Sequence, residues 1–353
     1  MLTVTSADGT TIAYRRLGDA GPAVILVHGG GQSGRHLEAL AAILAADGFT
    51  AYVPDRRGRG GSGPAGAGYG IATERADLAA LMAATGAGLL FGMSSGGLIV
   101  LDAARHLPGV RAVAVYEPPL SVGGSTPLGW VGRYERELAA GDPAGAAVTA
   151  MRGTRTGGPL LRLVPRWLLR RALSAALGAA SAPADMRAAS APADVRAASA
   201  PDAMGARPGR RRLLRVVLWP LRRLDRRRSP AAVTPATGAP AAVTPAAGAA
   251  GAGAVTAGAG AGERAAALRE LAATMGLDAR LVADSEGTLE DYRDLATPVL
   301  LLGGGRSPRY LRRTLRRLAA VLPDATLTVR RRAGHDVPTD TSELREFFQR
   351  RSK

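Results

Sequence analysis

The stretch LLFGMSSGGLIV, Leu89 to Val100, joins two apolar runs through two serines and three glycines. The run over residues 88–93 is typical of a buried strand, and residues 95–107 have the spacing of a helix. Glycines at such a junction allow two backbones to approach closely. The stretch therefore predicts a tight strand-to-helix turn, which serves either packing alone or the presentation of one serine to a substrate.

The segments around this turn repeat the same alternation. An Asp-Gly turn before residues 11–18 predicts a hairpin, and buried strands and amphipathic helices follow in turn. This alternation predicts an α/β fold with a mostly parallel sheet and helices on both faces. The expected strands are 23–29, 50–55, 88–93, 110–118, 298–305 and 325–331, and the expected helices are 36–48, 72–87, 95–107, 264–277, 307–324 and 342–351.

A long insertion interrupts this pattern. We expect residues 1–120 to form the first part of the core, 121–296 the insertion and 297–353 the second part. Within the insertion, residues 176–262 are of low complexity and contain tandem repeats such as SAPADMRAA followed by SAPADVRAA. Such Ala/Pro/Gly-rich sequence buries too little apolar surface to offset the entropy of ordering, which predicts disorder.

Composition excludes several function classes. The chain of 353 residues has no cysteine, which excludes disulfides, zinc–thiolate sites and a cysteine nucleophile. Its N-terminus does not resemble a signal peptide, and no apolar run approaches the length of about 20 residues that a membrane span needs. We therefore expect a cytoplasmic protein. The serine and histidine motifs at residues 92–96 and 334–335 add the expectation of a small-molecule substrate, no cofactor and no metal.

The net charge of +17 would ordinarily suggest a nucleic-acid partner. Nearly all of the basic residues are arginine, however, and a GC-rich coding sequence produces such an excess by mutation alone. The net charge is therefore weak evidence for a nucleic-acid partner. The Arg-flanked apolar segment 207–228 could bind nucleic acid or lie on an anionic membrane. Pro220 would interrupt a helix, and the surrounding repeats favour an expansion of the sequence without a selected function. We therefore expect no nucleic-acid partner.

The opening stretch contains a candidate nucleophile. Gly92-Met93-Ser94-Ser95-Gly96 fits G-x-S-x-G at a strand-to-helix junction, which is the context of a nucleophile elbow. The strained turn would project the Ser94 hydroxyl beside a helix N-terminus, which favours developing negative charge. Ser95 fits less well, because Met93 and Gly97 would then stand at the glycine positions. A glycine-rich turn of a nucleotide-binding fold is the structural alternative.

Two further motifs occur where a serine nucleophile needs them. His28-Gly29-Gly30 ends the strand 23–29, so the N–H groups of Gly30 and Ser95 would form an oxyanion hole. The His28 side chain itself is expected to brace this loop. His335 is the only histidine in a loop after a late strand, which makes it the candidate general base.

These motifs together resemble the α/β-hydrolase-fold serine hydrolases. The resemblance covers residues 1–120 and 290–353 and includes Asp55-x-Arg57-Gly58-x-Gly60-x-Ser62 and Gly334-His335. It implies that residues 118–296 stand where the family has a variable cap over the active site. It also implies a mainly structural role for the loop that begins at Asp55.

The chain departs from the family pattern at the triad acid. The family usually has Asp or Glu after the seventh strand, where this chain has GGGRSPRY, residues 303–310, without a carboxylate. Some members have the acid at the end of the sixth strand, and Glu117 stands there. Glu117 could equally be a buried or cap-anchoring glutamate. Asp291 and Asp294 are weaker candidates, and Asp336 is too close in sequence to His335 to orient its ring well.

The function predicted from these residues is hydrolysis of small ester or related acyl substrates. Ser94 would attack, His335 would take the proton, Glu117 would orient His335, and Gly30 and Ser95 would hold the oxyanion. Two alternatives use the same fold. One is a binding protein without turnover, and the other is a cofactor-free haloperoxidase or acyltransferase.

Overall fold

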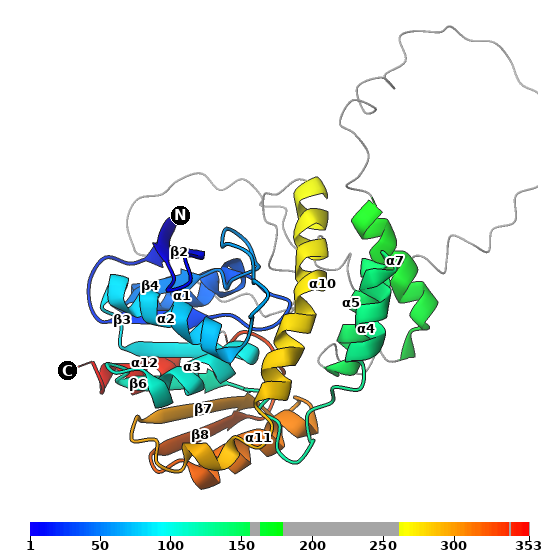
Figure 1. Cartoon of the computed structure of the whole chain (residues 1–353). Coiled ribbons are helices and arrows are strands. Elements are labelled where there is room, and N and C mark those ends of the chain that lie inside the picture. The colour runs from blue at the N-terminus through cyan, green and yellow to red at the C-terminus, as the bar shows by residue number, and fades with distance from the viewer. Residues whose placement is uncertain (156–162, 179–260, 339, 353) are drawn as a thin grey trace, which may run out of the picture. The chain divides into compact units, whose positions relative to one another are not determined.

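A computed structural model describes residues 1–155, 163–178, 261–338 and 340–352 (Figure 1). Its centre is an eight-stranded sheet in the order β1-β2-β4-β3-β5-β6-β7-β8. β1 and β2 pair antiparallel, β2 also pairs antiparallel with β4, and the pairs from β4 to β8 are all parallel. The strands are β1 Leu2–Thr5, β2 Thr11–Leu17, β3 Ala23–Val27, β4 Thr50–Pro54, β5 Leu89–Met93, β6 Ala112–Tyr116, β7 Val299–Gly304 and β8 Ala325–Arg330.

The predicted α/β class and mostly parallel sheet are confirmed. β5, β6 and β7 are buried along their whole length, as expected of central parallel strands covered on both faces. The predicted hairpin at the N-terminus is the β1–β2 pair, in which Thr5 lies opposite Thr11.

Helices cover both faces of the sheet. α1 (Glu38–Ala46) and α12 (Ser342–Gln349) pack on one face, where Phe49 and Phe348 meet. α2 (Ile71–Thr85), α3 (Ser95–His106) and α11 (Arg309–Val321) pack on the other. Figure 1 shows these layers around the strands. A short 3-10 helix, η1 (Gly34–Leu37), precedes α1.

Further helices lie between β6 and β7, within the predicted insertion. They are α4 (Val131–Ala139), α5 (Pro143–Gly153), α7 (Arg166–Gly178), α10 (Ala261–Asp284) and the 3-10 helix η2 (Leu289–Tyr292). The Tyr134 hydroxyl joins α4 to α10, since it donates to the Ala272 carbonyl at 2.6 Å and accepts from the Gly276 N–H at 3.2 Å.

The predicted low-complexity segment falls almost wholly outside the described residues. Residues 176–178 and 261–262 lie in α7 and α10, whereas the tandem repeats and the basic segment 207–228 are not described. The expected division at residues 120 and 296 stays a prediction. Among the described helices, none is both long and apolar enough to cross a membrane.

The turn between β5 and α3 lies against the end of β3. A Cβ atom on Gly96 would lie 2.4 Å from the Val27 carbonyl oxygen, and one on Gly92 would lie 2.4 Å from the Gly96 carbonyl oxygen. Real Cβ atoms do not approach backbone atoms so closely. The glycines of the opening stretch are therefore required by the contact of β5, α3 and β3.

We predict that Gly96→Ala lowers the free energy of unfolding by about 1–3 kcal/mol, the usual cost of overpacking. Gly68→Ala is the matched control, because a Cβ there meets no atom within 4 Å; it should change stability by less than about 0.5 kcal/mol. Urea unfolding of both variants measures the difference. Equal stabilities would contradict the close approach of these backbones.

Candidate active site

Ser94 occupies the turn between β5 and α3 in a conformation that few non-glycine residues adopt. Its backbone has φ 51° and ψ −123°, a strained state that costs on the order of 1–3 kcal/mol. Two hydrogen bonds hold it, because its N–H donates to the Tyr116 carbonyl at 2.8 Å and its carbonyl accepts from Gly97 at 2.8 Å. Ser95 begins α3, so its N–H has no partner within the helix and stands at the positive end of the helix dipole.

The loop after β3 lies beside this turn. A Cβ on Gly29 would lie 3.0 Å from the Ser94 Cβ, so the backbone of this loop and the Ser94 side chain are immediate neighbours. Gly30 follows in the same loop. The two residues expected to donate to an oxyanion, Gly30 and Ser95, thus stand on the two segments that meet at Ser94.

His28 braces this loop from inside the protein, as expected from the sequence. Its side chain is fully buried. Nε2 accepts a hydrogen bond from the Arg56 N–H at 3.1 Å, which leaves the proton on Nδ1, 2.9 Å from the Gly29 carbonyl. Burial, reinforced by the charges of Arg56 and Arg59, holds the pKa of His28 well below its ordinary value. His28 is therefore a neutral structural histidine.

The structure brings Glu117 and His335 together. Nδ1 of His335 lies 2.6 Å from Oε2 of Glu117, and Oε1 of Glu117 accepts a hydrogen bond from the Gly304 N–H at 2.7 Å. Glu117 is fully buried directly after β6, and its backbone has a positive φ of 50°. Both oxygens of the carboxylate are thus used, one to fix the imidazole and the other to fix the carboxylate itself.

Tyr116 connects this pair to the serine turn. Its carbonyl accepts from Ser94, and its hydroxyl donates to the Gly334 carbonyl at 2.5 Å. The Tyr116 and His335 rings lie 6.5 Å apart between centroids. Ser94 and His335 therefore flank the same tyrosine, although no hydrogen bond joins them among the described residues. Hydrogen bonds between catalytic groups are often long before substrate binds.

The end of β7 lies too close to the His335 loop for a side chain. A Cβ on Gly304 would lie 2.4 Å from the Ala333 carbonyl oxygen, and the Arg306 N–H donates to that same carbonyl at 3.0 Å. The loop after β7 thus supports the histidine loop through backbone contacts. Gly304 itself could therefore not be replaced by a residue with an acidic side chain.

The other carboxylates considered from the sequence do not contact His335. Asp291 is exposed and pairs with Arg105 at 3.1 Å, and Asp294 is also exposed. Asp336 makes no hydrogen bond to the neighbouring imidazole among the described residues. Burial raises its pKa from the ordinary aspartate value.

The loop that begins at Asp55 is structural. One oxygen of Asp55 accepts from the Gly34 N–H at 2.8 Å and the other from the Gly61 N–H at 3.0 Å. Ser62 closes the loop, because its hydroxyl donates to the Asp55 carbonyl at 2.5 Å and accepts from the Ala13 N–H at 2.9 Å. Both carboxylate oxygens of Asp55 thus accept backbone hydrogen bonds, which supports a structural role.

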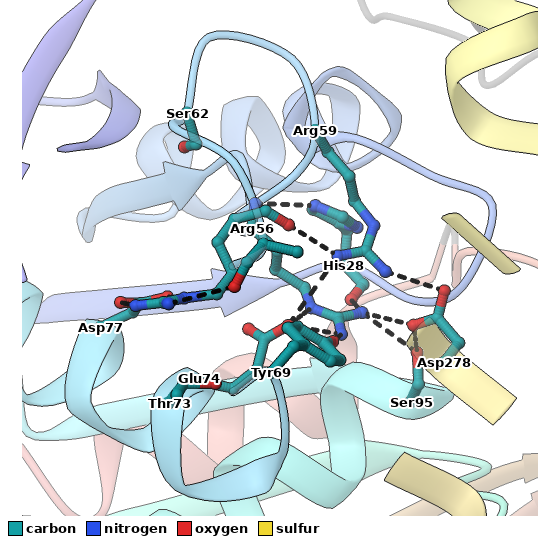
Figure 2. A network of polar contacts seen from close by, with 12 residues as sticks. His28, Arg56, Arg59, Ser62, Tyr69, Thr73, Glu74, Asp77, Ser95 and Asp278 are labelled. Atoms are coloured by element: carbon teal, nitrogen blue, oxygen red, sulfur yellow. Dashed lines mark hydrogen bonds and ion pairs between the residues drawn. The ribbon is translucent and has the colours of Figure 1, made fainter. Parts of the chain in front are cut away.

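A buried polar network connects this loop to α10 (Figure 2). Arg56 donates to Glu74, Tyr69 and Asp278, and Arg59 donates to Asp278 at 2.9 Å. Sequence analysis missed this network, because it attributed the arginines to composition and Asp278 lies more than two hundred residues away in the chain. The available signal was the run Arg56-Arg57-Gly58-Arg59 between a strand and a helix.

No group of three His, Cys, Asp or Glu side chains suited to a metal ion occurs within the described ranges. The chemistry that these residues can supply is that of a strained serine, a carboxylate-fixed imidazole and a helix N-terminus.

The fold can now be compared with those of known proteins. Residues 22–142 match the sequence family described as alpha/beta hydrolase fold. The chain has the alpha/beta hydrolase fold. An alpha/beta hydrolase from Sphaerobacter thermophilus is 27% identical, with a TM-score of 0.62 over 98% of this chain and 100% of the other. Comparison with curated proteins gives no match.

Two structures of esterases share the alpha/beta hydrolase fold with this chain. The esterase RhEst1 from Rhodococcus sp. is 21% identical, with a TM-score of 0.53 over 99% of this chain and 98% of the other. An esterase from Thermogutta terrifontis is 16% identical, with a TM-score of 0.56 over 100% of this chain and 99% of the other. At these identities the likeness shows the fold alone.

We predict that the folded protein keeps His28 neutral, with its proton on Nδ1, at pH values where a free histidine is already protonated. Because the unfolded chain binds a proton at His28 below about pH 6.5 and the folded chain does not, His28 makes the free energy of unfolding fall by about 1.4 kcal/mol per pH unit below that value. Long-range ¹H–¹⁵N NMR of the ring identifies the tautomer. A His28 signal that titrates near pH 6.5, as in the unfolded chain, would contradict the buried, neutral histidine.

Proposed function

We propose that this alpha/beta hydrolase is a serine hydrolase of small ester or related acyl substrates. The observation that carries the proposal is the 2.6 Å contact of His335 Nδ1 with Glu117, beside a serine held at φ 51°. A carboxylate on Nδ1 leaves Nε2 of the imidazole to act as a base, and it stabilises the imidazolium that forms. The strained turn presents the hydroxyl on which that base would act.

The proposed reaction has two halves. Ser94 Oγ attacks the carbonyl carbon while His335 Nε2 takes its proton, and the N–H groups of Gly30 and Ser95 hold the oxyanion of the tetrahedral intermediate. Collapse of this intermediate breaks the ester bond, and His335 returns the proton to the leaving alcohol. Water, deprotonated by His335, then attacks the acyl carbon, and the second tetrahedral intermediate collapses to release the acid while His335 returns the proton to Ser94 Oγ.

The position of Glu117 fits this mechanism although it departs from the more usual strand. The buried carboxylate accepts the Gly304 N–H and the imidazole, so its orientation is fixed on both sides. A buried glutamate that served packing alone would not need a histidine of a loop as its partner. The esterases among the similar structures support an ester as the substrate class, without identifying it.

We predict that a fluorophosphonate probe labels the wild-type protein and does not label Ser94→Ala. The organophosphorus centre requires an activated serine, and Ser94 is the one placed at the strained turn. Ser342→Ala, which removes an exposed hydroxyl from the start of α12, is the matched control and should label like the wild type. Mass spectrometry reads the labelling. An unlabelled wild-type protein would favour a binding function without turnover.

We predict that Glu117→Gln folds but loses kcat on the order of 10⁴-fold, as loss of a triad carboxylate does, because the amide favours the wrong tautomer of His335. Steady-state hydrolysis of p-nitrophenyl acetate measures the effect. Asp291→Asn, which breaks only an exposed ion pair with Arg105, should stay within about threefold of wild type, a change of less than about 1 kcal/mol. A Glu117→Gln enzyme with near-normal kcat would refute the role of Glu117.

A further inference from the structure

Asp278 of α10 is bound by three side chains of the α/β core. One of its oxygens accepts from Arg56 and from the Ser95 hydroxyl, both at 2.8 Å, and the other accepts from Arg59 at 2.9 Å. The carboxylate is almost completely buried. Figure 2 shows it between Ser95 and the two guanidinium groups. No step of the proposed reaction uses Asp278, so its contacts require another explanation.

Charge balance explains part of the cluster. Arg56 and Arg59 are buried with the carboxylates of Glu74 and Asp278, so that two positive and two negative charges share a dry interior. Buried charges must be paired in this way, because each one loses the stabilisation of water. Burial alone would raise the pKa of Asp278, but Arg59, Arg56 and the Ser95 hydroxyl outweigh it and hold that pKa well below its ordinary value.

Asp278 also touches both residues that are expected to donate to the oxyanion. The Ser95 hydroxyl lies between Asp278 and Arg56, which donates to it at 3.1 Å. Gly30 packs directly on the carboxylate, since a Cβ there would lie 2.9 Å from the Asp278 Cγ. Charge balance does not require either of these contacts.

We propose that Asp278 is a positioning residue, through which α10 fixes the oxyanion-binding N–H groups of Ser95 and Gly30. This inference rests on the proposed function. A serine hydroxyl has one proton to donate; donation to Asp278 and acceptance from Arg56 fix the Ser95 side chain in one orientation. Its backbone, the first residue of α3, is thereby held at the start of the helix.

The inference gives α10 a part in catalysis. The helix that precedes the return of the chain to the core would thus help to fix the oxyanion hole. Preorganised donors contribute strongly to catalysis, and a donor displaced by about 1 Å can cost up to 10²-fold in rate. Such a loss would appear in kcat, because the oxyanion exists only in the transition state and the intermediate.

The test compares Ser95→Ala, Asp278→Asn and the double variant in p-nitrophenyl acetate hydrolysis. Ser95→Ala keeps the ionic cluster and the Ser95 N–H, and should lower kcat about tenfold with KM within about twofold. Asp278→Asn should lower kcat by at least as much. Because both act through one contact, the double variant should resemble Asp278→Asn instead of showing the product of the two effects. Asp284→Asn, exposed at the end of the same helix, is the matched control.

A trifluoromethyl ketone, which forms an oxyanion on the nucleophile, supplies a second readout. Ser95→Ala should weaken its binding by about the same factor as kcat, while thermal unfolding shows an intact fold. This variant carries the test even where Asp278→Asn does not fold. Unchanged kcat and inhibitor affinity in Ser95→Ala, with Ser94 labelled by the probe in wild type, would overturn the positioning role alone. Failure of the wild type to label would overturn the proposed function as well.

Discussion

The structure of the site depends on the close approach of three backbones at the carboxyl ends of the central strands. The ends of β3 and β5 and the start of α3 meet so tightly that Gly92 and Gly96 have no space for a Cβ atom. This contact forces Ser94 into its positive φ and places the loop of Gly29 and Gly30 beside it. Functional residues are often found at the carboxyl ends of parallel strands, because the loops that follow these strands lie close together there. A packing constraint thereby brings Ser94, Ser95 and the loop of Gly29 and Gly30 together.

Buried arginines of the loop after β4 stabilise the loops at these strand ends. Arg57 forms a bidentate pair with Asp77 at 2.6 and 2.7 Å, and Arg56 and Arg59 bind Glu74 and Asp278. A guanidinium suits this work, because it stays charged and offers several donors in a fixed plane. The same ion pairs would be worth little at the surface. Here, removal of one partner would leave an uncompensated charge in the interior, which is strongly destabilising.

The fold and the serine turn could be predicted from sequence because both depend on local patterns. Alternating apolar runs define the strands and helices, and the glycines around Ser94 indicate the close backbone contact. Glu117 could only be kept as one of two interpretations, since its meeting with His335 joins residues far apart in the chain. Asp278 could not be found, because its partners are fixed by how α10 packs on the core. The buried arginines were misjudged, because arginine is so abundant in this chain that composition conceals the few that are paired inside.

The central claim is that Ser94, and not its neighbour Ser95, forms a covalent acyl intermediate. Rapid quenching of the enzyme with p-nitrophenyl acetate, followed by fragmentation of the peptide that contains both serines, tests it directly. If Ser94 is the nucleophile, we expect a pre-steady-state burst of about one p-nitrophenolate per enzyme and an acetyl group on Ser94. Acetylation of Ser95, or turnover without any acylated serine, would contradict it.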